Sequence, residues 1–264
     1  IVDLMNLVGY DAVTLGNHEF DYRMERLAEL VGMMDTKPIC CNFQKIGETE
    51  SYFEPYTIVS YGDVDIAYIG ITTPHTITSS SPAQFKDESG EYIYTFNPTA
   101  LYDFVQDAID SAKSEGADYV IALSHIGYAD NETYGDSEDI EDLIGNTDGF
   151  DVVLDAHSHS VIEGKTVVDE GGNEVLLSST GTKFEYIGML TISGGEFKTE
   201  LIKTEDYQKT DSVIDSYIEK INAEYAVLGD RKVAFSEVDL ITQDANGNRL
   251  VRNSETNLGD LCAE

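Results

Sequence analysis

Residues 10–22 read YDAVTLGNHEFDY, a short apolar run followed by Gly16 and a packet of polar side chains. Asn17, His18 and Asp21 in this packet carry groups that bind metal ions or transfer protons. An apolar run that ends at a glycine is typical of a strand opening into a loop. The stretch therefore predicts a strand with a functional loop at its carboxyl end.

The same pattern occurs twice more along the chain. The stretches 117–125 and 150–159 each contain an acidic residue, then an apolar strand and then histidine, and they read ADYVIALSH and FDVVLDAHSH. Open α/β sheets gather their ligands at the carboxyl ends of their strands. We therefore expect His125, His157 and His159 to meet Asn17 and His18 at one sheet edge.

The remaining elements alternate between helix and strand first and form hairpins afterwards. Apolar residues at helical spacing predict helices over 22–34, over a segment that begins at Asn97 (N-cap) and Pro98, near Ile140, and over 211–228. Strand pairs joined by turn residues predict hairpins at 56–61 with 64–71, 166–168 with 175–177, and 187–192 with 197–203. A further strand is expected at 233–240. This order predicts an α/β fold (α+β in some schemes), a layered β-sandwich flanked by helices.

Composition excludes several classes of protein. The 264 residues include 50 acidic and 16 basic side chains, for a net charge of −34, and 41% are hydrophobic. Such a charge argues against a nucleic-acid polymer or an anionic membrane surface as partner. The sequence contains no apolar run of the ~18 to 20 residues that a membrane span needs. Three cysteines without CxxC spacing support neither a disulfide framework nor a thiolate zinc site.

The ordered motifs resemble a known family. GNHEFDY at 16–22, ALSHIG at 122–127 and AHSH at 156–159 are similar to motifs of the calcineurin-like metallophosphoesterases. More narrowly they resemble the 5′-nucleotidases, a family that includes 2′,3′-cyclic phosphodiesterases and nucleotide-sugar hydrolases. VDLMNLVGYDAVTLGNHEFD at 2–21, ICCNF at 39–43 and IAYIGITTP at 66–74 fit the same family.

The resemblance implies an enzyme that hydrolyses nucleotide phosphate esters with two divalent metal ions, which could be Zn, Mn, Fe or Co. Its motifs place Asn17, His125 and His157 on one metal and His159 on the other. They place His18 against the phosphate, where it stabilises or protonates the leaving oxygen, and Asp21 beside His18 to orient its imidazole. The implied partner is a small nucleotide, and the implied location is the cell wall, the periplasm or the medium.

The resemblance also implies a domain organisation. Residues 1–205 are predicted to form the metallophosphoesterase core and 206–230 an interdomain helix. Residues 231–264 would open a nucleotide-binding domain, because RNSETNLGDLCAE at 252–264 is similar to the start of that domain in the family.

The sequence departs from the family in two respects. The family's Asp-x-His and Gly-Asp motifs, which supply the remaining ligands, are absent, and Ala156 replaces the usual glycine. We interpret the chain as a fragment that lacks the first metal motifs at its N-terminal side and most of the C-terminal domain. Such a fragment is expected to be inactive or weakly active, to bind one metal ion or none, and to self-associate through an uncovered strand edge.

Other interpretations remain open at this point. Asp21 also suits the N-cap of the helix that follows it, His75 is interpreted as a turn residue, and Glu19 as a hydrogen-bonding residue outside the site. At the level of function, the alternative to an enzyme is a catalytically silent surface or binding protein that keeps the fold.

Overall fold

The computed structural model describes residues 1–128, 139–232, 235–251 and 254–263. The described chain forms two compact units, residues 1–209 and 210–264. The first unit contains the sheets and all five histidines, and the second is mainly helix and turn. The predicted division at 205 and 230, and the nucleotide-binding character of the last segment, stay predictions.

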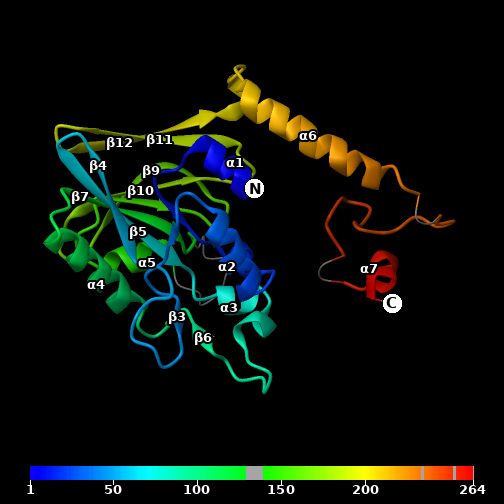
Figure 1. The fold of residues 1–264 in the computed structure, drawn as a ribbon, viewed down its shortest axis with the longest axis horizontal. Coiled ribbons are helices and arrows are strands. Elements are labelled where there is room, and N and C mark those ends of the chain that lie inside the picture. The colour runs from blue at the N-terminus through cyan, green and yellow to red at the C-terminus, as the bar shows by residue number, and fades with distance from the viewer. Residues whose placement is uncertain (129–138, 233–234, 252–253, 264) are drawn as a thin grey trace. The chain divides into compact units, whose positions relative to one another are not determined.

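A six-stranded mixed sheet forms the centre of the first unit (Figure 1). Its order is β4-β5-β7-β8-β10-β9, with parallel pairing from β5 to β10 and an antiparallel strand at each edge. The bounds are β4 Tyr56–Tyr61, β5 Val64–Thr72, β7 Tyr119–His125, β8 Val152–Asp155, β9 Val161–Val168 and β10 Glu174–Thr180. The central strands are covered on both faces of the sheet. This coverage explains the alternating and continuous apolar runs in their sequences.

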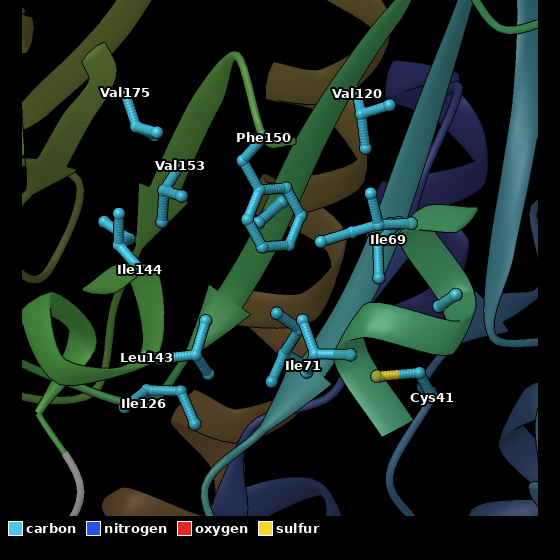
Figure 2. Close-up of a cluster of buried hydrophobic side chains, with 14 of the residues drawn as sticks. Cys41, Ile69, Ile71, Val120, Ile126, Leu143, Ile144, Phe150, Val153 and Val175 are labelled. Atoms are coloured by element: carbon cyan, nitrogen blue, oxygen red, sulfur yellow. The ribbon is translucent and has the colours of Figure 1, made fainter. Parts of the chain in front are cut away.

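Helices cover one face of the sheet. These helices are α4 (Leu101–Ser114) and α5 (Ile140–Gly145). Figure 2 shows side chains from the sheet, such as Ile69 and Val153, packed with Leu143 and Ile144 of α5. Both isoleucines are fully buried, as are Leu143 and Val153.

A β-hairpin covers the opposite face. It consists of β11 (Tyr186–Ser193) and β12 (Glu196–Lys203), which pair in antiparallel register. Leu190, Ile192 and Phe197 of this hairpin pack on Ile121 and Val152 of the sheet. The fold is thus the layered α/β arrangement that the sequence predicts, and all three predicted hairpins are confirmed.

Smaller elements complete the first unit. These are α1 Val2–Val8, β1 Val13–Thr14, a 3-10 turn at Asn17–Phe20, α2 Met24–Met33, β2 Pro38–Ile39, β3 Gln44–Lys45, α3 Thr76–Ser79, a 3-10 turn at Pro82–Phe85, β6 Tyr94–Thr95 and a 3-10 turn at Thr204–Asp206. The short pairs are β1 with β2, which are parallel, and β3 with β6, which are antiparallel. A separate aromatic core of Phe20, Phe43, Phe85 and Phe96 lies beneath them.

Two local predictions are wrong. Asn97 does not cap α4, whose N-cap is Ala100, because the Asn97 amide donates to the Asn42 carbonyl and Gln44 Oε1 at 3.1 and 2.9 Å. The described residues 235–240 form no strand, and 233–234 lie outside the described residues. Within 210–264, the only β-pairing among the described residues is an isolated bridge between Gln243 and Arg249. A strand at 235–240 would therefore have no neighbouring strand to pair with.

The second unit contains α6 (Ser212–Gly229) and α7 (Asn257–Ala263). The side chain of Asp211 caps α6 by accepting from the Val213 and Ile214 amides at 2.9 and 3.1 Å. In the described part of the chain, no helix is both long and apolar enough to cross a membrane.

Candidate active site

The predicted site residues follow parallel strands and lie at one edge of the sheet. β5, β7 and β8 run in the same direction, and Thr72 at the end of β5 pairs with His125 at the end of β7. β8 ends at Asp155, two residues before His157. The short strand β1, which leads to Asn17, packs against β5 and β7. The expected shared edge is therefore present.

His18 and Asp21 form a hydrogen-bonded pair on the loop that follows β1. The 3-10 turn at Asn17–Phe20 brings His18 Nδ1 to 2.8 Å from Asp21 Oδ2. An ionised carboxylate only accepts, so Nδ1 is the donor in this hydrogen bond, and Nε2 is left to hold or transfer a second proton. The His18 side chain is 77% exposed, against 34% for Asp21. The pair can therefore present an oriented imidazole to a ligand.

The same turn shows which roles Asp21 and Glu19 have in the local structure. Asp21 is not the N-cap of α2, since that position belongs to Arg23. Glu19 is exposed, and its carboxylate accepts from the Gly16 amide at 2.8 Å, which closes the turn. Glu19 is thus a hydrogen-bonding residue, as expected.

Asn17, His125 and His157 converge next to this pair. His125 Nε2 lies 3.1 Å from Asn17 Oδ1, and the rings of His125 and His157 are 5.0 Å apart between centroids. His159 is exposed and forms no hydrogen bond or ring contact with the other described residues, although its charge would influence both His125 and His157. The structure thus brings Asn17, His125 and His157 together, while His159 forms no hydrogen bond or ring contact with these three residues.

Burial keeps two of these imidazoles neutral. Burial, with smaller contributions from His157, His18 and His159, lowers the pKa of His125 to about 3. Burial also lowers the pKa of His157 to about 4, with contributions from His75, His159 and His18. Both rings are therefore unprotonated at neutral pH, which is the form that coordinates metal ions.

Asp155 connects the end of β8 to the loop that follows β7. Its buried carboxylate accepts from the backbone amides of Ile126 and Gly127, each at 3.1 Å. Burial raises the pKa of Asp155 to about 6, even though hydrogen bonds from Ser124 and these amides act in the opposite direction. Asp155 thus fixes the loop after His125 against the end of β8.

The donor set fits part of a metal centre. Imidazole nitrogen and amide oxygen suit zinc, manganese, iron or cobalt, and the convergence of Asn17, His125 and His157 provides both donor types. The carboxylates of Asp21 and Asp155 are already hydrogen-bonded, to His18 and to backbone amides. Among the described residues, no group of three or more His, Cys, Asp or Glu side chains is arranged to hold a metal ion.

Sequence reasoning missed two neighbours of the site. His75, interpreted as a turn residue, follows β5 and places its ring 6.0 Å from that of His157. Its position directly after a strand, like that of His125, indicates a site residue, but the preceding Thr-Thr-Pro favours a turn. Ser80 donates from Oγ to Asp21 Oδ1 at 3.0 Å, and nothing in the sequence indicates this contact across 59 residues.

Comparison with known proteins agrees with this geometry. The family described as calcineurin-like phosphoesterase matches residues 1–161, more than half of the 264 residues. The chain belongs to the calcineurin-like phosphoesterase family.

Two curated relatives of this chain are named for activity on nucleotides. A 2′,3′-cyclic-nucleotide 2′-phosphodiesterase/3′-nucleotidase of Haemophilus influenzae is 29% identical over 174 residues, covering 62% of the chain and 25% of the relative. A 5′-nucleotidase of Bos taurus is 30% identical over 171 residues, covering 61% and 26%. The matched part thus spans about a quarter of these curated relatives.

Solved structures share the fold. The 5′-nucleotidase precursor of Thermus thermophilus superposes with a TM-score of 0.72 at 24% identity, covering 98% of the chain and 51% of that structure. The calcineurin-like phosphoesterase YfkN of Bacillus subtilis gives 0.68 at 21%, covering 87% and 75%.

Proposed function

We propose that the protein hydrolyses phosphate esters of nucleotides, with His18 as the proton donor and Asn17, His125, His157 and His159 as metal ligands. One observation carries this proposal: an oriented His–Asp pair and a cluster of neutral imidazoles with an amide oxygen occupy the same sheet edge. The names of the relatives support nucleotides as the substrate class.

The chemistry divides between the metal ions and the protein. Bound divalent ions would neutralise the phosphate oxygens and lower the pKa of water. Asn17, His125 and His157 would hold one ion, and His159 would contact the second. Water adds to phosphorus and the bond between phosphorus and the ester oxygen breaks. The leaving oxygen takes the proton from His18 Nε2, and the proton released by water restores the imidazolium.

The local cations have to overcome the charge of the whole chain. A net charge of −34 repels an anionic nucleotide at long range. Only positive charge placed at the site itself reverses that field. This requirement is a second argument for metal ions at the edge, because the ligand imidazoles His125 and His157 are neutral.

The segment by itself is proposed to be a weak metal binder with little activity. The carboxylates nearest the cluster are engaged in hydrogen bonds, so the described donors supply only part of a metal centre. Release into the medium, the cell wall or the periplasm stays a prediction, as does association of the segment through its strand edges.

The test compares the full-length protein and this segment in metal analysis and in hydrolysis of a panel of nucleotides. In the full-length protein, His18→Ala should lower kcat by about 10²- to 10⁴-fold, because the leaving oxygen loses its proton donor. His157→Ala should lower both metal content and turnover. Arg26→Ala, which removes an exposed ion pair on α2, is the control and should retain full activity. Near-normal turnover in either histidine variant would reject the assignment.

A further inference from the structure

The segment from His75 to Ser80 follows β5 and lies against the catalytic loop. It contains α3 (Thr76–Ser79), which packs against the 3-10 turn that carries His18. Ser80 lies at the end of this helix, where its amide donates to the Thr76 carbonyl at 3.1 Å. The backbone of Ser80 is therefore fixed before its side chain is considered.

Ser80 engages the oxygen of Asp21 that His18 does not use. Ser80 Oγ donates to Asp21 Oδ1 at 3.0 Å, while His18 Nδ1 donates to Asp21 Oδ2 at 2.8 Å. A carboxylate held through one oxygen can rotate about its bond to Cβ. A second hydrogen bond from a separate segment fixes the carboxylate plane, and with it the direction of the imidazole.

We propose that Ser80 is a positioning residue that acts through Asp21 to orient His18. Its effect on catalysis rests on the proposed function, in which His18 Nε2 protonates the leaving oxygen. The hydroxyl of Ser80 does not touch the substrate in this scheme. Its loss should therefore weaken proton delivery and leave substrate binding nearly unchanged.

The adjacent serine provides a matched control. The buried Ser79 Oγ has no hydrogen-bond partner among the described residues, so Ser79→Ala removes a hydroxyl of the same helix turn without removing a bond. Ser80→Thr keeps the hydroxyl and should restore function. These two variants separate the hydrogen bond from any general disturbance of α3.

The kinetic test uses the full-length protein and two substrates. Ser80→Ala should lower kcat for a nucleoside monophosphate by about tenfold, the loss expected for one hydrogen bond to a charged group, with KM within about twofold. The loss should be smaller for 4-nitrophenyl phosphate, whose leaving group needs no proton. Equal losses for both substrates, or an equal loss in Ser79→Ala, would overturn the proposal.

A double-mutant cycle tests the route of the effect. In an Asp21→Ala background, Ser80→Ala should cause no further loss, because the carboxylate through which it acts is gone. A full tenfold additional loss would show that Ser80 acts by another route and would overturn the proposal.

A spectroscopic measurement makes the test independent of turnover. In the full-length wild-type protein, the ¹⁵N spectrum of the neutral form of His18, which remains after Nε2 has given up its proton, should report a proton fixed on Nδ1, and Ser80→Ala should give a mixture of tautomers in that form. An unchanged His18 spectrum in Ser80→Ala overturns the role of Ser80. If the wild-type protein hydrolyses no nucleotide, the proposed function fails, and this spectrum alone decides whether Ser80 orients His18.

Discussion

The close approach of Gly16 to His125 shows how a single residue shapes the site. A Cβ atom on Gly16 would lie 2.7 Å from His125 Cε1 and 2.8 Å from Nε2, well inside van der Waals contact. The Gly16 backbone, at φ −96° and ψ −175°, is one that any residue adopts. The need for glycine is therefore steric, and it arises from the imidazole that faces Asn17.

Gly16→Ala should consequently displace His125 from Asn17 and lower hydrolysis of nucleotides by about 10- to 100-fold, since small misplacements at a reacting centre have effects of this size. Steady-state kinetics on the full-length protein measure this loss. Gly32→Ala is the control, because a Cβ atom there meets nothing within 4 Å. It lies inside α2 and should keep full activity with a stability gain of up to about 1 kcal/mol. Full activity in Gly16→Ala would contradict the described packing.

At the scale of elements, Asn42 connects segments beneath the site. Its fully buried amide donates to the carbonyls of Thr72 and Phe96 at 2.7 and 3.0 Å, and its oxygen accepts from the Thr72 amide at 3.1 Å. Thr72 Oγ1 in turn donates to the Leu15 carbonyl at 2.8 Å. The ends of β2 and β5 and the strand leading to Asn17 are thereby held in one network.

Asn42→Ala should lower the free energy of unfolding by about 3 kcal/mol, because three buried backbone groups lose their partner. Denaturant titration of the segment measures the change. Asn146→Ala removes one exposed hydrogen bond, from Nδ2 to the Asp142 carbonyl at 2.7 Å, and should lower it by less than about 1 kcal/mol. A loss at Asn42 no larger than the loss at Asn146 would refute the role of this network.

The turn between β9 and β10 depends on an ionised carboxylate. Asp169 accepts from the Asn173 amide at 2.7 Å and from the Gly149 amide at 3.2 Å. Burial acts to raise the pKa of Asp169, but these bonds and the Asn173 side chain outweigh it, so the pKa lies below its usual value of 3.8. A carboxylate with a depressed pKa stabilises the fold above its unfolded pKa and loses that contribution as pH falls.

Asp169→Asn should therefore lower the free energy of unfolding by about 1 to 2 kcal/mol at pH 7. The difference from wild type should shrink as the pH falls below 3.8, where the wild-type carboxylate also becomes protonated. Denaturant titrations at several pH values test both statements. A difference that is constant or grows on acidification would contradict the assignment.

At the scale of the whole molecule, local patterns predicted the fold better than they predicted the contacts between distant segments. Apolar periodicity and turn residues located the hairpins and the strands that end at His125 and Asp155, because both signals act over a few residues. The capping role of Asn97 was wrong because a tertiary hydrogen bond to Asn42 competes for its amide. The contact between Ser80 and Asp21 could not be predicted, since it depends on how two loops pack.

The position of the metal ions provides the most direct test of the site. Crystals of the full-length protein, measured with anomalous diffraction at the absorption edge of the bound metal, would locate each ion. We expect a peak within bonding distance of Asn17 Oδ1, His125 and His157, and a second peak beside His159. A catalytically active crystal form whose metal peaks lie away from these four residues would contradict their assignment as metal ligands.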